Sequence, residues 1–202
     1  MLSYFSPEQR QKLASARVGL AGTGGLGSNA AMMLARCGVG RLILIDADKV
    51  EASNLNRQYY FPRHLGMPKE KALADQLREL CPAPEVETLT LWLEDGNIAA
   101  LLDKADVWLE CLDDARLKAR FTAMALSAGC TVVSASGMGG FGGFAMTRRV
   151  MKSASGLLAA VGDFRSGVDS LPPLAPRVMQ CAAMQADAAL EFILTGNIKP
   201  LL

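Results

Sequence analysis

Histidine is almost absent from this sequence, because the 202 residues include only His64. A metal site that needs several histidines from one chain is therefore excluded, and a Ser-His-Asp triad would have to include this residue. His64 follows Pro62 in a segment predicted to be a loop, so we expect a surface histidine rather than a catalytic one.

Cysteine pairs of the zinc-binding kind are also missing. The five cysteines are Cys37, Cys81, Cys111, Cys130 and Cys181. No two lie three residues apart, which excludes a C-x-x-C zinc motif, and a chain of this length needs no disulfide scaffold. We therefore expect a reducing compartment, no zinc, and thiols that mostly act as small buried hydrophobic side chains.

The sequence lacks both a strong charge of one sign and a long apolar run. Lys and Arg number 21 against 20 Asp and Glu, and this balance argues against a non-specific nucleic-acid binder. No run of about 18 apolar residues could span a membrane, and no secretory signal opens the chain. We expect a cytoplasmic protein with neither nucleic acid nor a membrane as a partner.

Apolar strands and amphipathic helices alternate over most of the chain, and half of the residues are hydrophobic. We expect strands at 18–21, 42–45, 86–91, 107–112 and 131–135, and helices at 6–15, 29–37, 69–80, 98–102 and 116–128. This alternation predicts an α/β fold, a Rossmann-like three-layer sandwich whose mostly parallel sheet has helices on both faces. The length suits a single domain over residues 1–202.

The pattern changes after Ser136. The run SGMGGFGG indicates a flexible turn, and residues 146–161 are predicted to form two further strands, antiparallel and near the C-terminal end of the chain. Residues 165–176 are rich in Pro, Gly and Ser and suggest a long loop, and a closing helix is expected over 175–195.

A glycine motif follows the first predicted strand and opens the next helix. Gly22, Gly24 and Gly27 form G-x-G-x-x-G, with Gly25 inside the motif. Glycine permits a tight turn and a close approach to phosphate, and the start of a helix offers free N–H groups. Asp46 ends the next strand, where an acidic residue usually binds ribose hydroxyls. Together these features predict a nucleotide site rather than a ligand-free contact between helix and strand.

The residues that follow Asp46 favour a triphosphate over NAD. Arg57 and Lys69 would place two cations near the phosphates, and Asn54 and Gln58 accompany them. Two cations suit charge that develops on a triphosphate during reaction. Asp113 follows a predicted strand at the same edge of the sheet, where a carboxylate suits Mg²⁺ held between protein and phosphate oxygens. Its neighbour Asp114 is predicted to cap the next helix.

Four segments, GTGGLGSN, LIDADKVEASNLNRQ, GMPK and ECLDD, resemble the E1-like activating enzymes of the ThiF/MoeB/HesA family in order and spacing over residues 15 to 145. The APRV segment before the closing helix resembles the compact bacterial members. The resemblance implies adenylation of the C-terminal Gly-Gly of a small ubiquitin-like sulfur carrier such as ThiS, with thiamine thiazole synthesis as the expected pathway. It also implies a homodimer.

The resemblance assigns roles to individual residues. Those that match the family motifs are Gly22, Gly24 and Gly27 for the ATP loop, Asp46 for ribose, Asn54, Arg57 and Gln58 for N-x-x-R-Q, Lys69 for P-K, and Asp113 for Mg²⁺. The implied reaction is attack of the carrier carboxylate on the α-phosphorus of ATP, with Arg57, Lys69 and Mg²⁺ stabilising the charge on the phosphates. No general base is needed, because a C-terminal carboxylate is ionised at neutral pH.

The chain departs from longer family members in three ways. It lacks their two C-x-x-C pairs, and near its N-terminus Arg10 is a weak match for an arginine that reaches the partner's active site. No cysteine matches the family's sulfur-transfer loop, and Cys181 is expected in the core. Met138 and Phe141 either flank a channel for the Gly-Gly tail or belong to a plain turn.

Two other functions stay open from the sequence alone. One is a non-catalytic nucleotide-binding module with the same fold, which the missing family elements suggest. The other, weaker, is an NAD-dependent oxidoreductase. Pyrophosphate release separates the first from an adenylyltransferase, and competition between ATP and a nicotinamide cofactor tests the second.

Overall fold

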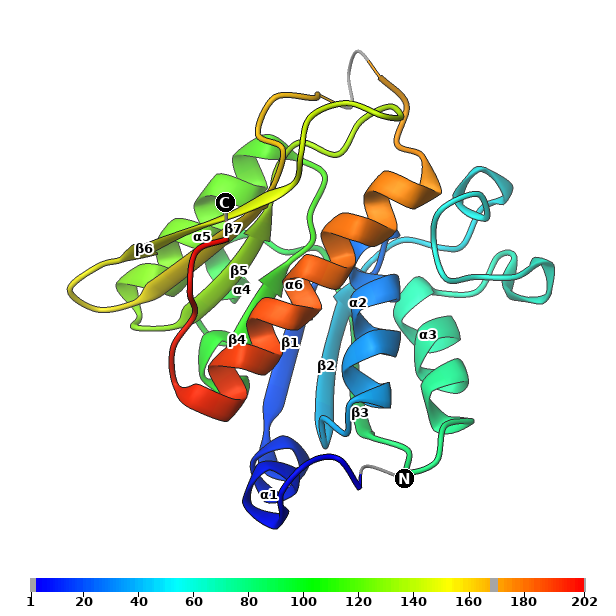
Figure 1. Cartoon of the computed structure of the whole chain (residues 1–202). Helices are drawn as coiled ribbons and strands as arrows, with labels where there is room; N and C mark the ends of the chain where they lie inside the picture. The colour runs from blue at the N-terminus through cyan, green and yellow to red at the C-terminus, as the bar shows by residue number, and fades with distance from the viewer. Residues whose placement is uncertain (1–2, 168–170, 202) are drawn as a thin grey trace.

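One seven-stranded sheet runs through the computed structural model, which describes residues 3–167 and 171–201 (Figure 1). The strands are β1 (Arg17–Ala21), β2 (Arg41–Asp46), β3 (Glu85–Thr90), β4 (Val107–Glu110), β5 (Thr131–Ala135), β6 (Thr147–Lys152) and β7 (Leu157–Gly162). Their order is β3-β2-β1-β4-β5-β7-β6. Among the strands of the described residues, only β6 pairs antiparallel, with β7. The predicted α/β sheet with antiparallel strands near the C-terminal end is confirmed.

Helices cover both faces of the sheet and so make three layers (Figure 1). They are α1 (Pro7–Ser15), α2 (Gly25–Arg36), α3 (Lys69–Arg78), α4 (Asp95–Ile98), α5 (Ala115–Ser127) and α6 (Ala175–Thr195), with 3₁₀ turns η1 (Ala52–Asn54), η2 (Pro62–His64) and η3 (Leu102–Lys104). In Figure 1, α2, α3 and α6 lie in front of the sheet and α4 and α5 lie behind it. No helix in the described ranges is long and apolar enough to cross a membrane.

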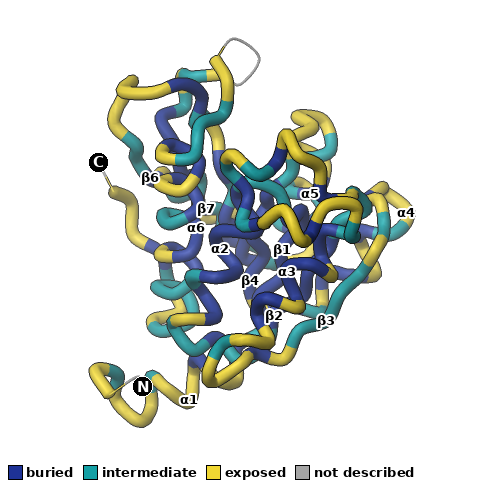
Figure 2. Tube along the Cα trace, turned by 90° about the vertical axis from the view of Figure 1, so that its right-hand side faces the viewer, coloured by how far each residue is buried: buried dark blue, intermediate teal, exposed yellow. Residues whose placement is uncertain are grey.

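Two hydrophobic cores follow from this layering, because side chains alternate between the faces of each strand. Leu20, Leu42 and Leu44 pack with α2, α3 and α6 on one face. Ile43 and Trp108 pack on the other face with α4 and α5. The strands β1, β2 and β4 form the buried centre in Figure 2, whereas α1 is largely exposed at the lower end of the molecule.

Three predicted boundaries are wrong for local reasons. The first long helix starts at Gly25 rather than 29, because the glycine motif itself forms its first turn. The helix expected at 98–102 is displaced: α4 ends at Ile98 and η3 begins only at Leu102. The strand expected at 107–112 ends at Glu110, whose carboxylate Oε1 accepts a hydrogen bond from the N–H of Leu112 at 2.8 Å and so turns the chain.

Candidate nucleotide site

A cleft of about 880 Å³ opens at the carboxyl ends of the parallel strands, the upper edge of the sheet in Figure 1. Ligands bind at this edge in open α/β sheets, where neighbouring strand ends meet. Predicted site residues that line the cleft are Gly22, Gly24, Gly25, Asp46, Arg57, Gln58, Lys69 and Asp113. The structure therefore brings together eight residues that lie up to about 90 positions apart in the chain.

The glycine loop has a shape that only glycine allows at two positions. Gly22 has φ +95°, and a Cβ there would lie 2.8 Å from the carbonyl oxygen of Cys111. A Cβ on Gly27 would lie 2.0 Å from the carbonyl oxygen of Gly22. Gly27 does not line the cleft; its role in the structure is to let α2 start directly against the end of β1.

Replacing Gly27 by alanine is expected to lower the free energy of unfolding by about 1–3 kcal/mol, because the added methyl group forces backbone apart. Denaturant unfolding would measure the change. Gly96→Ala is the matched control: a Cβ at position 96 would meet nothing within 4 Å, so the variant should be neutral or slightly stabilised. Equal stability of both variants would contradict this role for Gly27.

Asp46 holds the glycine loop as well as lining the cleft. Its Oδ2 accepts hydrogen bonds from the N–H of Thr23 at 2.7 Å and from Thr23 Oγ1 at 2.9 Å, and its Oδ1 accepts one from the N–H of Asp48 at 2.9 Å. A carboxylate offers about four acceptor sites, so one stays available for a hydroxyl. This fits the predicted contact with ribose.

Lys69 begins α3 as a buried cation. Its Nζ lies 2.7 Å from Asp48 Oδ2, and its side chain is 9% exposed against 44% for Asp48. Its N–H also donates to the carbonyl oxygen of Asp48 at 2.9 Å. Asp48 therefore holds Lys69 at the edge of the cleft.

Arg57 and Gln58 reach the cleft from the segment between β2 and α3. The guanidinium Nη1 of Arg57 donates to the carbonyl oxygen of Ser53 at 2.9 Å and to Asn56 Oδ1 at 2.8 Å. Gln58 is 8% exposed, and its Oε1 has no partner among the described residues. A buried oxygen without a hydrogen-bond partner beside the glycine loop indicates a position at which a hydrogen-bond donor of a ligand would bind.

Two polar residues that sequence reasoning missed hold this segment against the glycine loop. Asn29 Nδ2 donates to the carbonyl oxygens of Gly25 at 2.6 Å and of Arg57 at 3.0 Å. Ser28 Oγ donates to the carbonyl oxygen of Gly24 at 2.6 Å and accepts from the N–H of Tyr59 at 2.9 Å. Polar side chains at the buried start of an apolar helix were the available clue.

Asn54 does not line the cleft. Its Oδ1 accepts from the N–H of Glu51 at 3.0 Å, and its Nδ2 lies 3.4 Å from Ser53 Oγ. The residue is 8% exposed. In this structure Asn54 shapes the η1 turn that precedes Arg57, so its direct contact with nucleotide stays a prediction.

The two neighbouring aspartates after β4 have different surroundings. Asp114 Oδ1 accepts from the N–H of Leu117 at 2.7 Å and caps α5, as predicted. Asp113 is exposed in the cleft and has no hydrogen bond or ion pair with any described residue. No cluster of three or more His, Cys, Asp or Glu suited to a metal occurs in the described ranges. One free carboxylate fits Mg²⁺, which is commonly held by one or two carboxylates together with substrate phosphates.

A third cation, which the sequence did not indicate, lines the cleft. Lys118 Nζ lies 2.5 Å from Glu110 Oε2 and donates to the carbonyl oxygen of Ala135 at 3.1 Å. Glu110 is fully buried, and its Oε2 also accepts from Ser134 Oγ at 2.6 Å. This network joins β4, β5 and α5 beneath the cleft.

The cysteines show no activated thiol near the cleft. Burial, the largest influence, raises the pKa of Cys111 well above its usual range and that of Cys181 to about 12. Both are buried, which confirms the core role predicted for Cys181. Cys81 is exposed, and Cys37 and Cys130 are half-buried, so the expectation of mostly buried thiols holds only in part.

The prediction of a surface histidine is wrong, because His64 is 5% exposed. Its Nδ1 accepts a hydrogen bond from the N–H of Phe61 at 3.0 Å, which requires an unprotonated Nδ1. Burial first, and then the charge of Arg63, lower the pKa of His64, while Asp75 and Glu79 act weakly in the opposite direction.

The free energy of unfolding is therefore expected to fall as the pH drops through 6.5, the ordinary histidine pKa, toward the lower folded value. Between these two pKa values the unfolded chain binds a proton at His64 and the folded chain does not. Chemical denaturation between neutral and mildly acidic pH would show the slope. His64→Gln should remove it, since the chain has no other histidine, and an unchanged slope would refute the assignment.

The sequence of this chain is similar to that of known proteins over most of its length. The model of the ThiF family matches residues 1–201. The chain belongs to the ThiF family. It is 33% identical over 144 residues to the sulfur carrier protein ThiS adenylyltransferase of Escherichia coli, covering 71% of this chain and 57% of that protein. It is also 33% identical over 135 residues to the molybdopterin-synthase adenylyltransferase of the same organism, covering 66% and 54%. The chain thus spans little more than half of these relatives.

A solved structure supports the fold of this ThiF family member. The Escherichia coli tRNA N6-threonylcarbamoyladenosine dehydratase, in complex with AMP, aligns with a TM-score of 0.85 at 21% identity and covers 96% of this chain and 92% of that one. Family relatives also include the vegetative protein HesA of Trichormus variabilis, which is 37% identical over 112 residues, or 55% of this chain and 42% of that protein. The predicted resemblance to the ThiF/MoeB/HesA group is confirmed.

The sequence suggested active-site roles for three more residues, Arg10, Met138 and Phe141, which lie in different places in the structure. Arg10 is exposed on α1, at the opposite end of the sheet from the cleft, and its Nη1 donates to the carbonyl oxygen of Phe5 (Figure 1). Any action of Arg10 on a cleft would have to be across a dimer. Met138 lines the cleft, whereas Phe141 is 86% exposed.

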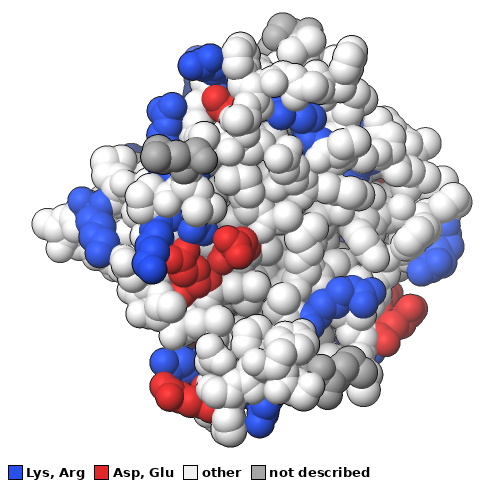
Figure 3. Space-filling view, in the orientation of Figure 1, with Lys and Arg blue, Asp and Glu red and all other residues white. Residues whose placement is uncertain are grey.

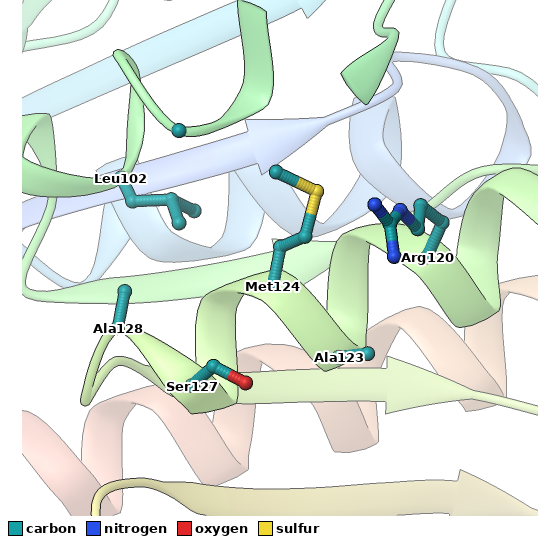
Figure 4. A pocket seen from close by; sticks show the side chains of 7 residues that line it. Leu102, Arg120, Ala123, Met124, Ser127 and Ala128 are labelled. Carbon is teal, nitrogen blue, oxygen red and sulfur yellow. The ribbon is translucent and has the colours of Figure 1, made fainter. Parts of the chain in front are cut away.

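A smaller hollow of about 420 Å³ lies beside α5, where Ala99 and Leu102 also line it. Figure 4 shows Met124 and Arg120 rising from α5 toward Leu102. The lining side chains are mostly small or apolar, and Arg120 is paired with Asp95 at 2.8 Å. This hollow lacks the polar groups that the cleft brings together.

Proposed function

We propose that this chain is an ATP-dependent adenylyltransferase that activates the C-terminal Gly-Gly carboxylate of a small ubiquitin-like sulfur carrier of the ThiS type. One observation carries the proposal: the glycine loop, the cations Arg57 and Lys69 and the carboxylate of Asp113 line one cleft of about 880 Å³, which residues after β5 and β7 also line. The ThiS and molybdopterin-synthase adenylyltransferase relatives support this reaction class. The solved dehydratase is also known in complex with ATP, which is consistent with a nucleotide here.

The proposed reaction needs positioning and charge stabilisation more than covalent help. A carboxylate oxygen of the carrier forms a bond to the α-phosphorus while the bond to the bridging oxygen of pyrophosphate breaks, and pyrophosphate leaves with that electron pair. The product is an acyl adenylate. Because a C-terminal carboxylate has a pKa of about 3.5, no proton has to be removed.

Each part of the cleft has a role in this scheme. The free N–H groups at the start of α2 would bind the phosphates, and Arg57 and Lys69 would stabilise negative charge that gathers on them. Asp113 would hold Mg²⁺, which when bound neutralises charge on the triphosphate. Asp46 would bind the ribose and Gln58 would supply an acceptor near the glycine loop.

We propose a pathway, a location and a domain organisation. The pathway is thiamine thiazole synthesis, since the ThiS adenylyltransferase is among the relatives that cover the largest share of this chain. The location is the cytoplasm, and residues 1–202 form a single adenylation domain. We also propose a homodimer. In Figure 3 few charged side chains occupy the middle of the face that α2 and α6 form, and Met33, Met184 and Phe192 are only partly buried there.

Pyrophosphate release tests the proposal directly. The purified chain with ATP, Mg²⁺ and ThiS should release pyrophosphate, and ThiS without its last glycine should not support it. Molybdopterin-type carriers in parallel reactions would test the pathway. ATP binding without pyrophosphate release from any carrier would favour the non-catalytic module, and calorimetry with preferential NAD binding would favour the oxidoreductase.

A further inference from the structure

Two loops form the wall of the cleft on the β5 and β7 side. We call them the glycine-rich loop (residues 136–146) and the second loop (residues 163–167). Ser136, Gly137 and Met138 from the first and Ser166 and Gly167 from the second line the cleft. The glycine-rich segment was predicted as a flexible turn, but it is packed against the second loop and against Leu171 and Pro172.

Close contacts with the second loop explain why positions 137 and 139 are glycine. A Cβ on Gly137 would lie 2.1 Å from Asp163 Oδ1, and one on Gly139 would lie 2.9 Å from the carbonyl oxygen of Gly167. Gly140 donates its N–H to the carbonyl oxygen of Pro172 at 3.0 Å. These positions therefore have no room for a Cβ, and the loop backbone itself approaches its neighbours closely.

A buried ion pair sits where the two loops meet. Arg177, in the first turn of α6, is 7% exposed and pairs through Nη2 with Asp163 Oδ2, and Asp163 is 5% exposed. Arg177 Nη1 also donates to the carbonyl oxygens of Gly142 and Phe144, each at 3.0 Å. One guanidinium therefore holds both the glycine-rich loop and the second loop.

Asp163 organises the second loop in the same way. Its Oδ1 accepts from the N–H groups of Arg165 and Ser166 at 2.8 Å, and its Oδ2 accepts from Ser166 Oγ at 2.6 Å. Ser166 Oγ in turn accepts from the N–H of Gly139 at 3.1 Å. Burial alone would raise the pKa of Asp163, but the hydrogen bonds from Ser166 and Arg165 and the charge of Arg177 outweigh it and lower the pKa.

The order of the strands assigns this wall to the second substrate. The phosphates belong at the end of β1 and the ribose at the end of β2, so the base extends toward β3. The ends of β5 and β7 lie on the other side of β1 and are left for the group that attacks the α-phosphorus. Val178, next to Arg177, would lie 2.9 Å from a Cβ on Gly25, which places this wall beside the glycine loop.

We propose that the Asp163–Arg177 pair is a positioning device that holds the two loops as a preformed slot for the extended C-terminal tail of the acyl donor. This inference rests on the proposed adenylation of a carrier. A Gly-Gly tail has no side chains to recognise, so a slot for it must be narrow, made largely of backbone, and fixed before binding. The pair acts on the carrier and not on the nucleotide.

The chain provides a matched control in a second buried arginine. Arg148 on β6 is 3% exposed and pairs through Nη2 with Glu191 Oε2 at 2.6 Å and through Nη1 with Asp187 Oδ2 at 3.3 Å. Both partners belong to α6, as Arg177 does, but neither they nor Arg148 line the cleft. Removing Arg177 leaves the buried carboxylate of Asp163 without its cation, and removing Arg148 leaves Glu191, whose side chain is 21% exposed, without its cation. Both losses should therefore destabilise the fold.

The experiment compares Arg177→Met, Arg177→Lys and Arg148→Met with the wild type, using ThiS as the carrier. Arg177→Met should raise the KM for ThiS by roughly ten- to 10²-fold, since small displacements of a positioned group are costly, while the dissociation constant for ATP from calorimetry stays unchanged. Arg177→Lys should recover part of the loss, because lysine keeps the charge but not the fork of donors. Arg148→Met should lower the melting temperature and leave both constants unchanged.

Ser166→Ala gives a milder change if Arg177→Met does not fold, and it should raise the KM for ThiS to a smaller extent. The inference is overturned if Arg148→Met and Arg177→Met affect the KM for ThiS equally, or if Arg177→Met weakens ATP binding as much as carrier use. A wild type that turns over no carrier at all would instead refute the proposed function, and this inference with it.

Discussion

Arg57→Ala is expected to slow pyrophosphate release by roughly 10²–10³-fold, the usual effect of losing one group that stabilises charge in the transition state. Arg57 lines the cleft, and its Cγ would lie 3.8 Å from a Cβ on Gly25 of the glycine loop. Its hydrogen bonds go to the nearby Ser53 and Asn56 in the same exposed turn, so its removal should change the free energy of unfolding little. Rates at saturating ATP and carrier would separate lost catalysis from lost binding.

Arg63→Ala is the control for this variant. Arg63 lies in the same segment, with its guanidinium 4.9 Å from the centre of the Phe61 ring, and it does not line the cleft. The Arg63→Ala substitution removes the same positive charge from the chain, but at a residue outside the cleft. Normal turnover by Arg57→Ala, or an equal loss in Arg63→Ala, would remove Arg57 from the mechanism.

Asp113→Asn is expected to lower the rate by roughly 10²-fold at a fixed, low Mg²⁺ concentration, because metal binding supplies several kcal/mol of charge stabilisation. The carboxylate is exposed and has no bond to any residue in the described part of the chain, so its loss should not disturb the fold. Added Mg²⁺ should recover part of the rate. A titration of pyrophosphate release with Mg²⁺ would measure the shift.

Asp114→Asn removes the same charge one residue further along. Asn caps a helix about as well as Asp, so the hydrogen bond to the N–H of Leu117 can be kept. This variant should retain its rate and its Mg²⁺ requirement. If the two variants depended equally on Mg²⁺, the overall negative charge of this turn, and not a direct Mg²⁺ ligand at position 113, would determine the rate of pyrophosphate release.

Much of the fold was predictable because its elements depend on local patterns. The alternation of apolar strands with amphipathic helices up to residue 135 predicted the parallel sheet, and the glycine motif with Asp46 predicted the edge of the sheet at which the cleft lies. These signals come from residues close together in the chain. The first turn of α2 was misplaced because Gly25 is a poor helix former in isolation, whereas in the structure it begins α2 directly beside Val178 of α6.

The missed features depend on partners far away in the chain. His64 looks like a surface residue until Tyr60 and Phe61 are seen to cover it. Lys118 lines the cleft because it pairs with Glu110 on β4, and nothing within α5 indicates that. The glycine-rich loop was predicted to be flexible, because the contacts that fix it come from Arg177, about 35 residues further along the chain. Local propensity carries no information on such contacts.

The intact mass of the carrier tests the central claim most directly. ThiS incubated with this protein, ATP and Mg²⁺ should gain the mass of one adenylyl group at its C-terminus, and the gain should disappear when its final glycine is removed. The same reaction with Arg57→Ala should show the adduct only after much longer incubation. ThiS and molybdopterin-type carriers that stay unmodified, while the wild-type protein binds ATP, would contradict the account.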